Sequence, residues 1–474
     1  MWRAKISSGM SALTAVILAA GEGVRMRSRR PKALHELCGR PLIEYPINAA
    51  KALGARLVVV IGRDADRVTD AVKAVSDATL VEQTERLGTG HALLQAREAC
   101  MQDGVILVLP ADMPLLSEAT LRRLVTHHTE TRAAATLLTA ELEDPTGYGR
   151  VVREQGRPVG IVEHRDASPA ERAIHEIGTS AYCFDARHLW PALLRVSPRN
   201  QQREYYLTDV IGILHREGQG VEAVTVDDPR EGLGVNDRRQ LAELAAVMRR
   251  RILDRLMVEG VTILDPASTY VDDTVAVGID TVLHPGVILA GRTTVGAECV
   301  VGAGSSVSGS RIGDRVTLLP YCVLNDSTVE NGAFLGPFCH LRPLSHVGPG
   351  AKIGNFVELK KSRIGRGAKV PHLAYVGDAT LGENVNFGAG AITCNYDGTA
   401  KHETVVGAGA FIGTNASLVA PITVGDGAYV GAGSVITRDV PPGALAVTRA
   451  TQTVREGWAA ARARKRKKTG EAHE

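Results

Sequence analysis

The sequence predicts an α/β domain with a mostly parallel sheet, followed by a long helix and a parallel β-helix. Three observations predict this order. Short apolar runs alternate with helical patterns up to about residue 236, apolar residues then recur at helical spacing over 237–260, and a six-residue repeat follows. We therefore expect three parts with the bounds 1–236, 237–260 and 261–474.

The composition of the 474 residues suits two or three packed domains. Hydrophobic residues make up 44% and charged residues 23%, while 50 glycines and only 4% aromatics suit the tight corners of a solenoid. The net charge is +3, and Arg462–Lys468 alone carries six positive charges, so the remainder is −3 (3 − 6). This excludes a basic nucleic-acid-binding body, and we expect the basic tail to be solvated and disordered.

Location is also constrained by the sequence. No apolar run approaches the about 20 residues that a membrane span needs, so we expect none. The seven cysteines are scattered without a Cys-x-x-Cys pair, which favours free thiols in a reducing cytoplasm over disulfides or a zinc site. Residues 1–9 lack the apolar core of a signal peptide, and we interpret them as a short extension before an alternative start at Met10.

The first domain is expected to have ligands at the carboxyl edge of its sheet. Gly21 and Asp112 both follow predicted buried strands, and ligands bind beyond the carboxyl ends of strands in such sheets. Pro41 would occupy the first turn of the first helix, and Gly54 would end it. The expected strands are Thr14–Ala20, Leu57–Ile61, Val105–Leu109 and Ala133–Ala140, and the expected helices are Pro41–Leu53 and Ser117–Arg132.

A long helix is expected over residues 237–259. Asp237 can cap it, Gln240 can reach back as the capping partner, and Gly260 ends it. At about 1.5 Å per residue the helix would span roughly 35 Å. Two alternatives stay open: a helix that packs on the first domain, or a semi-rigid connector between the domains.

The six-residue repeat is most regular between Val406 and Val435. Each repeat opens with an aliphatic residue, usually followed by glycine, and a mostly small residue lies four positions after each opener. Such repeats predict coils that stack because one coil cannot bury its own apolar face. About 180 residues at about 18 per coil predict roughly ten coils. The five openers are Val406, Ile412, Leu418, Val424 and Val430, and the small positions are Ala410, Ala416, Ile422, Ala428 and Ser434.

The repeat fails in the polar stretch from Cys394 to Glu403. We expect this stretch to be a loop that leaves the rod. Loops on rigid scaffolds often carry function, so the stretch is a candidate binding element.

The first domain carries a glycine-rich loop with basic companions. Leu18–Met26 reads LAAGEGVRM and is followed by Pro31–Leu34, which is not a Walker loop. Glycines let backbone N–H groups approach a phosphate, and Arg25 and Lys32 can neutralise it. The motif resembles the signature loop of nucleotidyltransferases that activate sugar phosphates. Supporting phrases follow at Gln83 with Leu87–His91, at Asp112, and at Pro145–Arg150, Gly160–His164, Glu204–Asp209 and Gly234–Asp237.

Together with the repeats, these motifs resemble the bifunctional N-acetylglucosamine-1-phosphate uridylyltransferase and glucosamine-1-phosphate N-acetyltransferase family. The resemblance covers residues 11 to 458. It implies a Rossmann-like nucleotidyltransferase domain, a linker helix and a left-handed parallel β-helix of hexapeptide repeats. It also implies acetyl transfer from acetyl-CoA, then uridylyl transfer from UTP, supplying UDP-N-acetylglucosamine for peptidoglycan, lipopolysaccharide and lipid A. Family members form homotrimers through the β-helix, with the acetyl site at the subunit junction.

The resemblance implies roles for residues of the first domain. Arg25 would be catalytic and, with Lys32, would contact phosphates, while Asp112 and Asn236 would bind Mg²⁺, which holds oxygen ligands and offsets phosphate charge. The UTP and UDP-N-acetylglucosamine positions are Leu18, Ala19, Ala20, Gly21, Lys32, Gln83, Gly88, Thr89, Gly149, Glu163 and Asn236.

Three positions depart from the family pattern. Pro110-Ala111 precedes Asp112 where the family often has a glycine, and Arg86 stands where glutamine is expected. Gly178 replaces an asparagine whose amide should contact the sugar. The last change bears on selectivity for the sugar.

The resemblance implies an acetyltransferase site in the second half. His372 would accept the proton of the amine because a neutral imidazole titrates near neutral pH. The glucosamine-1-phosphate positions are Arg342, Lys360, Tyr375, Asn386 and Lys401. The acetyl-CoA positions are Ala389, Asn395, Tyr396, Thr414 (serine in much of the family), Ala432 and Arg449.

Three rival interpretations stay open. A γ-class carbonic anhydrase could use zinc-binding histidines on such a rod, although the neighbours of His284, His340, His346, His372 and His402 fit the acetyltransferase better. A nucleotide-sugar pyrophosphorylase could use the rod only for assembly, which His372 and Asn395-Tyr396 argue against. A trimeric scaffold without turnover would not need Arg25, Lys32, Asp112 and Asn236.

Overall fold

The computed structural model describes residues 12–62, 65–100 and 104–469, with side chains described up to residue 465. The proposed extension at 1–9 lies outside these residues. The chain divides into two compact units. The first contains the chain up to Arg255 and the short segment Val271–Thr274, and the second contains Leu256–Tyr270 and the chain from Val275. No helix in the described parts of the chain has the length and apolar character needed to cross a membrane.

The first unit is built on a nine-stranded sheet, whose main path has the order β11-β7-β10-β6-β1-β4-β5. Neighbours on this path are parallel except where β10 pairs antiparallel with β6 and β7. The strands are β1 (Leu13–Ala19), β4 (Arg56–Gly62), β5 (Thr79–Gln83), β6 (Val105–Pro110), β7 (Ala135–Glu141), β8 (Arg150–Glu154), β9 (Arg157–Val162), β10 (Glu176–Asp185) and β11 (Val221–Thr225), with a separate hairpin of β2 (Glu36–Leu37) and β3 (Arg40–Pro41).

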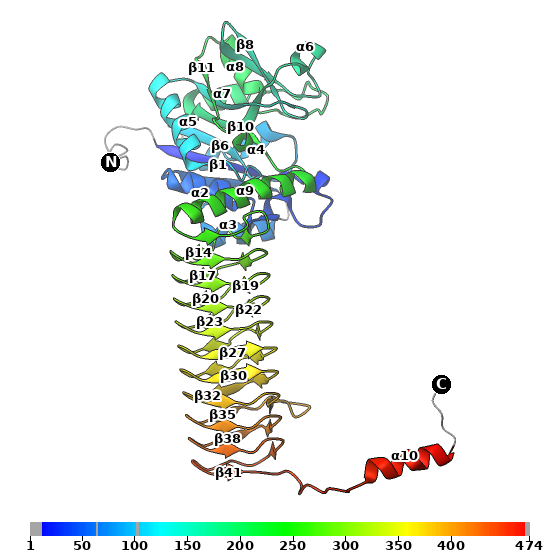
Figure 1. The fold of residues 1–474 in the computed structure, drawn as a ribbon. Coiled ribbons are helices and arrows are strands. Elements are labelled where there is room, and N and C mark those ends of the chain that lie inside the picture. Colours follow the sequence, from blue (N-terminus) through cyan, green and yellow to red (C-terminus); the bar gives the residue numbers. More distant parts are fainter. Residues whose placement is uncertain (1–11, 63–64, 101–103, 470–474) are drawn as a thin grey trace. The chain divides into compact units, whose positions relative to one another are not determined.

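Helices cover both faces of this sheet (Figure 1). On β1, Ala15 and Ile17 belong to one buried cluster and Val16 to another, so alternate side chains enter two cores. The helices are α2 (Glu44–Ala52), α3 (Asp66–Val75), α4 (Thr89–Gln95), α5 (Glu118–Thr131), α6 (Pro169–Arg172), α7 (Ala186–Leu193), α8 (Asp209–Arg216) and α9 (Arg238–Val258), with 3₁₀ turns η1 (Val24–Met26), η2 (Lys32–Leu34), η3 (Arg97–Ala99) and η4 (Pro229–Gly232).

The expected start of the first helix at Pro41 is wrong. Pro41 lies in β3, and α2 begins only at Glu44. Cys38 and Gly39 have positive φ angles of 45° and 80°, which form a tight turn between β2 and β3. Pro41 is therefore held in an edge strand, where its missing N–H is tolerated.

Helix α9 packs on the first unit. The Arg251 guanidinium donates hydrogen bonds to the Leu115 carbonyl oxygen at 2.7 Å and to Asp228 at 2.9 Å, while Leu244 and Ile252 are buried. These contacts favour the packed helix over the semi-rigid connector. Asp237 caps the helix through the backbone N–H of Gln240.

The Gln240 side chain reaches back one residue further than a capping box requires. Its Oε1 accepts from the backbone N–H of Asn236 at 2.8 Å rather than from that of Asp237. The N-terminal cap of α9 therefore also holds Asn236, a predicted ligand of Mg²⁺.

The second unit is a parallel β-helix, and Figure 1 shows its coils stacked one on the next. Three parallel sheets form its faces, which confirms the predicted fold class. The first sheet contains β12 (Thr262–Ile263), β15 (Val282–Leu283), β18 (Val300–Val301), β21 (Thr317–Leu318), β24 (Phe334–Leu335), β27 (Lys352–Asn355), β30 (Lys369–His372), β33 (Asn386–Phe387), β36 (Phe411–Ile412), β39 (Tyr429–Val430) and β41 (Leu445–Ala446).

The other two faces repeat the same spacing. The second sheet contains β13 (Tyr270–Val271), β16 (Ile288–Ala290), β19 (Ser306–Ser308), β22 (Val323–Asn325), β25 (His340–Leu341), β28 (Glu358–Lys360), β31 (Tyr375–Gly377), β34 (Ile392–Cys394), β37 (Ser417–Val419) and β40 (Val435–Ile436). The third contains β14 (Ala276–Val277), β17 (Thr294–Val295), β20 (Arg311–Ile312), β23 (Thr328–Val329), β26 (His346–Val347), β29 (Arg363–Ile364), β32 (Ala379–Leu381), β35 (Thr404–Val406) and β38 (Ile422–Val424).

The repeat positions form the interior of the β-helix. All five openers and all five small positions between 406 and 434 are buried. Glycine follows most openers because the next coil leaves no room for a side chain. A Cβ on Gly413, for example, would lie 2.5 Å from the backbone nitrogen of Ala432. The repeat therefore encodes both the core and the spacing of the coils.

The predicted departure of the chain at 394–403 is confirmed. Ala379 pairs with Thr404, which lies 25 residues later (404 − 379), whereas Thr404 pairs with Ile422 after 18 residues (422 − 404). The additional residues form a hairpin between β34 and β35.

The basic tail differs from its prediction. Helix α10 (Trp458–Thr469) forms where an irregular segment was expected. Alanine, arginine and lysine, which dominate this stretch, have high helix propensity. Residues 458–465 are exposed, in line with the expected solvation.

Candidate active sites

A cavity of about 1100 Å³ lies at the carboxyl edge of the sheet in the first unit. It contains the ends of β1 and β6, as expected for ligand sites in such sheets. Every residue that the sequence analysis assigned to uridylyl transfer lines it. These are Leu18, Ala19, Ala20, Gly21, Arg25, Lys32, Gln83, Gly88, Thr89, Asp112, Gly149, Glu163 and Asn236.

Two basic side chains hold the two proposed metal ligands. Lys32 Nζ pairs with Asp112 Oδ2, and the Arg25 guanidinium donates to Asn236 Oδ1 at 2.8 Å. The backbone brings the two ligands together, because the N–H of Val235 donates to the Asp112 carbonyl oxygen at 2.9 Å. The side-chain oxygens of Asp112 and Asn236 and the cationic groups of Arg25 and Lys32 thus meet in the cavity, although they come from four separate segments of the chain.

Glycines allow the close approach of these segments. Gly23 has a φ of 64°, and a Cβ there would lie 2.5 Å from Lys32 Cβ. Gly88 has a φ of 108°, and a Cβ there would meet the Tyr205 carbonyl oxygen at 2.7 Å. Both positions therefore require glycine, which explains the glycine-rich phrases of the sequence.

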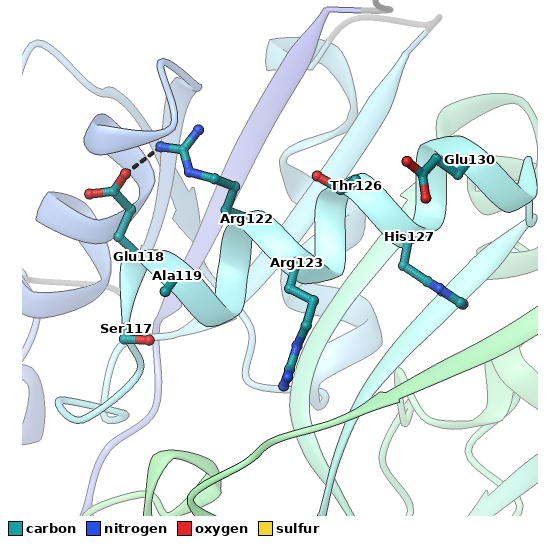
Figure 2. A pocket seen from close by; sticks show the side chains of 8 residues that line it. All are labelled: Ser117, Glu118, Ala119, Arg122, Arg123, Thr126, His127 and Glu130. Carbon is teal, nitrogen blue, oxygen red and sulfur yellow. Dashed lines mark hydrogen bonds and ion pairs between the residues drawn. The ribbon is translucent and has the colours of Figure 1, made fainter. Parts of the chain in front are cut away.

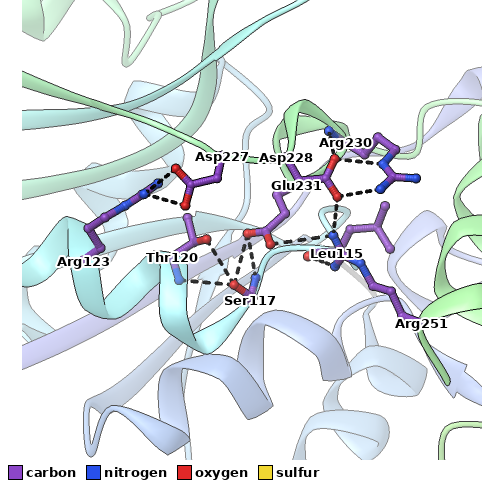
Figure 3. A network of polar contacts seen from close by, with 9 residues as sticks. All are labelled: Leu115, Ser117, Thr120, Arg123, Asp227, Asp228, Arg230, Glu231 and Arg251. Atoms are coloured by element: carbon purple, nitrogen blue, oxygen red, sulfur yellow. Dashed lines mark hydrogen bonds and ion pairs between the residues drawn. The ribbon is translucent and has the colours of Figure 1, made fainter. Parts of the chain in front are cut away.

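A network of polar contacts supports the segment before Asn236, and Figure 3 shows its members. Glu231 accepts hydrogen bonds from the backbone N–H and hydroxyl of Ser117, the N-cap of α5. Arg251 of α9 reaches Asp228 and Glu231 from the other side, at 2.9 and 3.6 Å. The turn η4, which leads to Asn236, is therefore fixed between two helices.

One carboxylate at the cavity is strongly buried. Glu163 accepts a hydrogen bond from the Thr208 hydroxyl at 3.2 Å, and burial raises its pKa. Gly149 lies next to it, since a Cβ on Gly149 would be 3.5 Å from Glu163 Oε1. This end of the cavity can accept hydrogen bonds from the hydroxyl groups of a sugar.

The three departures from the family pattern all lie at this cavity. Arg86 forms an ion pair with Glu22, and both residues line the cavity. Gly178 lines it as well, where a Cβ would meet Ile161 Cδ1 at 2.9 Å. Pro110 ends β6, and the Ala111 N–H donates to the Leu18 carbonyl oxygen at 3.1 Å.

Several lining residues were missed as site residues. Tyr148, Glu204 and Thr208 line the cavity, and they belong to the motifs Pro145–Arg150 and Glu204–Asp209. They were not predicted because they lie outside the glycine-rich phosphate loop, on other segments that line the cavity. A second hollow, of about 830 Å³, runs along α5 (Figure 2). Its lining residues, Ser117, Glu118, Ala119, Arg122, Arg123, Thr126, His127 and Glu130, include no predicted site residue.

In the β-helix, His372 lies in a column of residues at one corner. Backbone hydrogen bonds connect the column from coil to coil. The carbonyl oxygens of Asn355, His372, Ala389 and Thr414 accept from the N–H groups of Leu373, Gly390, Asn415 and Gly433, respectively, each on the next coil. The Arg449 guanidinium extends the column by donating to the Ala432 carbonyl oxygen at 3.0 Å. The predicted base and four of the predicted acetyl-CoA positions, Ala389, Thr414, Ala432 and Arg449, therefore follow one another along the rod.

A cluster of charged side chains lies on the neighbouring coils. Arg342 pairs with Glu358 at 3.0 Å, and Lys360 with Asp378 at 3.1 Å. Lys401 lies beside Lys360, and this close interaction lowers the pKa of Lys401. Positive charges from three different parts of the chain thus gather beside two carboxylates, Glu358 and Asp378, and an anion could be bound by these positive groups.

The hairpin at 394–403 is held by its own polar contacts. Asp397 accepts from the backbone N–H groups of Thr399 and Ala400, both at 2.8 Å, and from His402 Nε2 at 2.6 Å. Tyr396 and Lys401 face each other across the hairpin as an antiparallel bridge. The hairpin therefore carries Tyr396, which was predicted to contact acetyl-CoA, and Lys401, which was predicted to contact glucosamine-1-phosphate.

The remaining predicted positions lie on adjoining strands. The amide of Asn395 donates towards the Tyr375 hydroxyl at 3.4 Å. Asn386 begins β33, where it pairs with Lys369 of the strand that ends in His372. Among the described residues, no three His, Cys, Asp or Glu side chains form a group that could hold a metal ion.

Comparison with known proteins gives matches over both units. Residues 15–207 match the family model described as a MobA-like NTP transferase domain. Residues 403–438 match the model for six bacterial transferase hexapeptide repeats, and residues 292–318 match a hexapeptide repeat of succinyl-transferase.

Relatives align along almost the whole chain. The chain is similar to the "Bifunctional protein GlmU" of Brevibacillus brevis, with 50% identity over 97% of this chain and 100% of the relative. It is 47% identical to the proteins of that name from a Geobacillus species, over 94% and 97% of the two chains, and from Trichlorobacter lovleyi, over 95% and 98%. These matches confirm the resemblance inferred from the motifs, and the chain belongs to the GlmU family of bifunctional proteins.

Proposed function

We propose that the first unit transfers a uridylyl group and the β-helix transfers an acetyl group. The protein is a bifunctional transferase of UDP-N-acetylglucosamine synthesis, as its family membership indicates. Glucosamine-1-phosphate is acetylated first, and its product is then joined to the uridylyl group of UTP with release of diphosphate. We assign uridylyl transfer to residues 1–236, acetyl transfer to 261–474, and the connection to 237–260.

One observation carries the first assignment: Arg25, Lys32, Asp112 and Asn236 meet in the cavity. A phosphate oxygen of the sugar phosphate attacks the α-phosphorus of UTP, and diphosphate leaves. The two substrates are both anions, so Arg25 and Lys32 would reduce their repulsion and align them. No general base is required because the attacking phosphate is already ionised.

The two oxygen ligands fit a magnesium ion. Asp112 and Asn236 supply few, hard oxygen atoms in a wide cavity, which suits a cation that keeps most of its water. When bound, Mg²⁺ would offset phosphate charge. Leu18 to Gly21, Gln83, Gly88 and Thr89 would hold the uridine part, while Gly149 and Glu163 would hold the sugar.

His372 would act as the base of acetyl transfer. Its Nε2 accepts a proton from the sugar amine as the nitrogen attacks the thioester carbonyl carbon. The C–N bond forms and the C–S bond breaks, and the proton passes to the leaving CoA sulfur. Arg342, Lys360 and Lys401 would hold the phosphate or sugar, with Tyr375 and Asn386 beside them. Acetyl-CoA would lie along Ala389, Asn395, Tyr396, Thr414, Ala432 and Arg449.

Exposed aromatic side chains support the proposal of a homotrimer formed through the β-helix. Tyr321, Phe338 and Phe356 stack on successive coils, with ring centroids 5.2 and 5.3 Å apart. All three are exposed in the single chain. Such an apolar row is stabilised when another surface covers it.

Two assays on one purified sample test the proposal. One measures CoA release from acetyl-CoA with glucosamine-1-phosphate, and the other measures diphosphate release from UTP with N-acetylglucosamine-1-phosphate and Mg²⁺. We expect both. Diphosphate release alone would leave the rod as an assembly device, whereas CoA release alone would mean that Arg86, Pro110-Ala111 or Gly178 has disabled or redirected the first site.

A further inference from the structure

Asp378 is a nearly buried carboxylate that the sequence motifs did not assign. It lies at a corner between β31 and β32, and its φ of 46° is in the left-handed region. Only 9% of its side chain is exposed. A carboxylate this buried is retained only when hydrogen bonds and cations offset its desolvation, so its partners show what it does.

The partners of Asp378 come from both substrate regions. Its Oδ2 accepts a hydrogen bond from Lys360 Nζ at 3.1 Å and another from Asn395 Nδ2 at 2.6 Å. Lys361 Nζ lies 3.7 Å from the other oxygen. One oxygen atom therefore joins a residue assigned to the sugar phosphate with a residue assigned to acetyl-CoA.

The backbone of Asp378 links the same two segments. Its N–H donates to the Lys360 carbonyl oxygen at 2.9 Å, and its own carbonyl oxygen accepts from Thr404 at 3.1 Å. Asn395 and Thr404 lie on the two sides of the hairpin that carries Tyr396 and Lys401. Asp378 therefore holds the hairpin at both of its ends.

The negative charge of Asp378 offsets the positive charges of the lysine side chains around it. Burial alone would raise the pKa of Asp378, but hydrogen bonds from Asn395 and Lys360 lower it, so the carboxylate stays ionised. Lys401 lies beside Lys360 and carries the same charge. Without Asp378, repulsion would separate the two ammonium groups before the sugar phosphate binds.

We propose that Asp378 is a positioning residue of acetyl transfer. It fixes the Lys360 ammonium and the Asn395 carboxamide relative to each other, so the amine of one substrate meets the thioester of the other. The inference rests on the proposed function of the β-helix. It adds to that function a residue that need not touch either substrate.

Asp378→Asn tests the charge with little change in shape. Asparagine tolerates the left-handed conformation, so the corner should keep its backbone. We expect the KM for acetyl-CoA and for glucosamine-1-phosphate to rise, and kcat/KM to fall about tenfold, as for loss of a charge-assisted hydrogen bond. Uridylyl transfer by the same sample should not change.

Asp326→Asn is the matched control. Asp326 occupies the same corner three coils earlier, with a φ of 42° and the corresponding backbone hydrogen bond to Ser308. Asp326→Asn therefore makes the same chemical change as Asp378→Asn, but outside the predicted site. Both activities and the melting temperature should stay at the wild-type values.

Double variants distinguish positioning from a general structural role. In an Asn395→Ala background, Asp378→Asn should change the KM for acetyl-CoA less than twofold, because its partner is already absent. In a Lys360→Met background, Asp378→Asn should likewise change the KM for glucosamine-1-phosphate less than twofold. Effects that multiply in both backgrounds, or a single variant with wild-type kinetics, would overturn the inference.

The wild-type protein separates this inference from the proposed function. If it releases no CoA from acetyl-CoA and glucosamine-1-phosphate, the proposed function of the β-helix fails, and the role of Asp378 fails with it. If CoA is released but the double variants show multiplying effects, only the role of Asp378 is wrong.

Discussion

The Nδ1 atom of His372 lies 2.6 Å from the Oδ1 atom of Asn355, its neighbour on the preceding coil. A carboxamide oxygen only accepts hydrogen bonds, so the proton of the neutral ring resides on Nδ1. The lone pair is then on Nε2. Asn355 thereby gives His372 the tautomer that the proposed role as a base requires.

Replacing Asn355 by alanine should lower kcat for acetyl transfer about tenfold. The loss corresponds to one hydrogen bond of about 1–1.5 kcal/mol that orients the ring and its tautomer. CoA release at saturating substrate measures it. Asn355→Asp, which restores an oxygen acceptor, should recover most of the activity; no recovery would indicate that Asn355 acts in another way.

Replacing His372 by alanine should lower acetyl transfer by about 10²–10⁴, the usual contribution of a general base. Uridylyl transfer should be unchanged in the same sample. His346→Ala serves as the control because His346 lies in β26 on another face, 3.5 Å from Glu330. An acetyl transfer rate that survives the loss of His372 would show that the base has been misassigned.

Lys32→Met should reduce kcat/KM for uridylyl transfer by about 10²–10³, as expected when a positive group is removed from a charged transition state. Diphosphate release measures the effect, and acetyl transfer should be preserved. Arg30→Met is the matched control, since Arg30 belongs to the same loop but pairs with Glu36 instead. Similar losses in both variants would contradict the role of Lys32.

Asp228 makes the stability of the first unit dependent on pH. Hydrogen bonds from Arg230, opposed by burial and helped by Arg251, lower its pKa from 3.8 to about 2. The folded-state pKa lies below the unfolded value. The stabilisation is therefore present above about pH 4 and is lost as the pH falls from about 4 to 2.

Asp228→Asn should consequently lower the free energy of unfolding at pH 7. The pKa change corresponds to about 2.5 kcal/mol, and solvent screening reduces this to about 1–2 kcal/mol because 26% of the side chain is exposed. Urea unfolding at pH 7 and pH 3 should show the difference from wild type shrinking at the lower pH. Asp227→Asn, whose carboxylate is 87% exposed, should change stability by less than about 0.5 kcal/mol.

Phe338→Arg should weaken self-association. Phe338 is the middle ring of the stack with Tyr321 and Phe356, and a guanidinium there would place a charge in an apolar interface. Light scattering coupled to size-exclusion chromatography would measure the mass at several concentrations. Ile288→Arg, on the outer surface of an earlier coil, is the control. An unchanged mass for Phe338→Arg would place the interface elsewhere.

Much of the architecture could be predicted from local patterns. The six-residue repeat determines which side chains are buried, and each glycine after an opener marks the approach of the next coil. In the first unit, buried strands that end in glycine or aspartate located the cavity. Pro41 was misassigned because the turn at Cys38 and Gly39 determines its conformation, and this turn has no signal in helical periodicity.

The contacts between distant residues were harder to predict. Asp378 follows a repeat corner with no motif of its own, and its partners Lys360 and Asn395 lie 18 and 17 residues away. Only the stacking of coils and the inserted hairpin bring them together. Arg251 was likewise hidden, because helical spacing identifies the buried face of α9 but not the carbonyl group that its guanidinium meets.

The assignment of Val271–Thr274 to the first unit has a consequence for separating the two activities. Asp273 accepts a hydrogen bond from Arg40 at 2.6 Å, and the N–H of Asp273 donates to the Cys38 carbonyl oxygen at 3.0 Å. A fragment that stops after α9 would lack these partners and would expose the β2–β3 hairpin. A gene truncated at residue 258 therefore encodes a first unit that lacks one of its segments, whereas a fragment that extends through residue 274 keeps every segment of that unit.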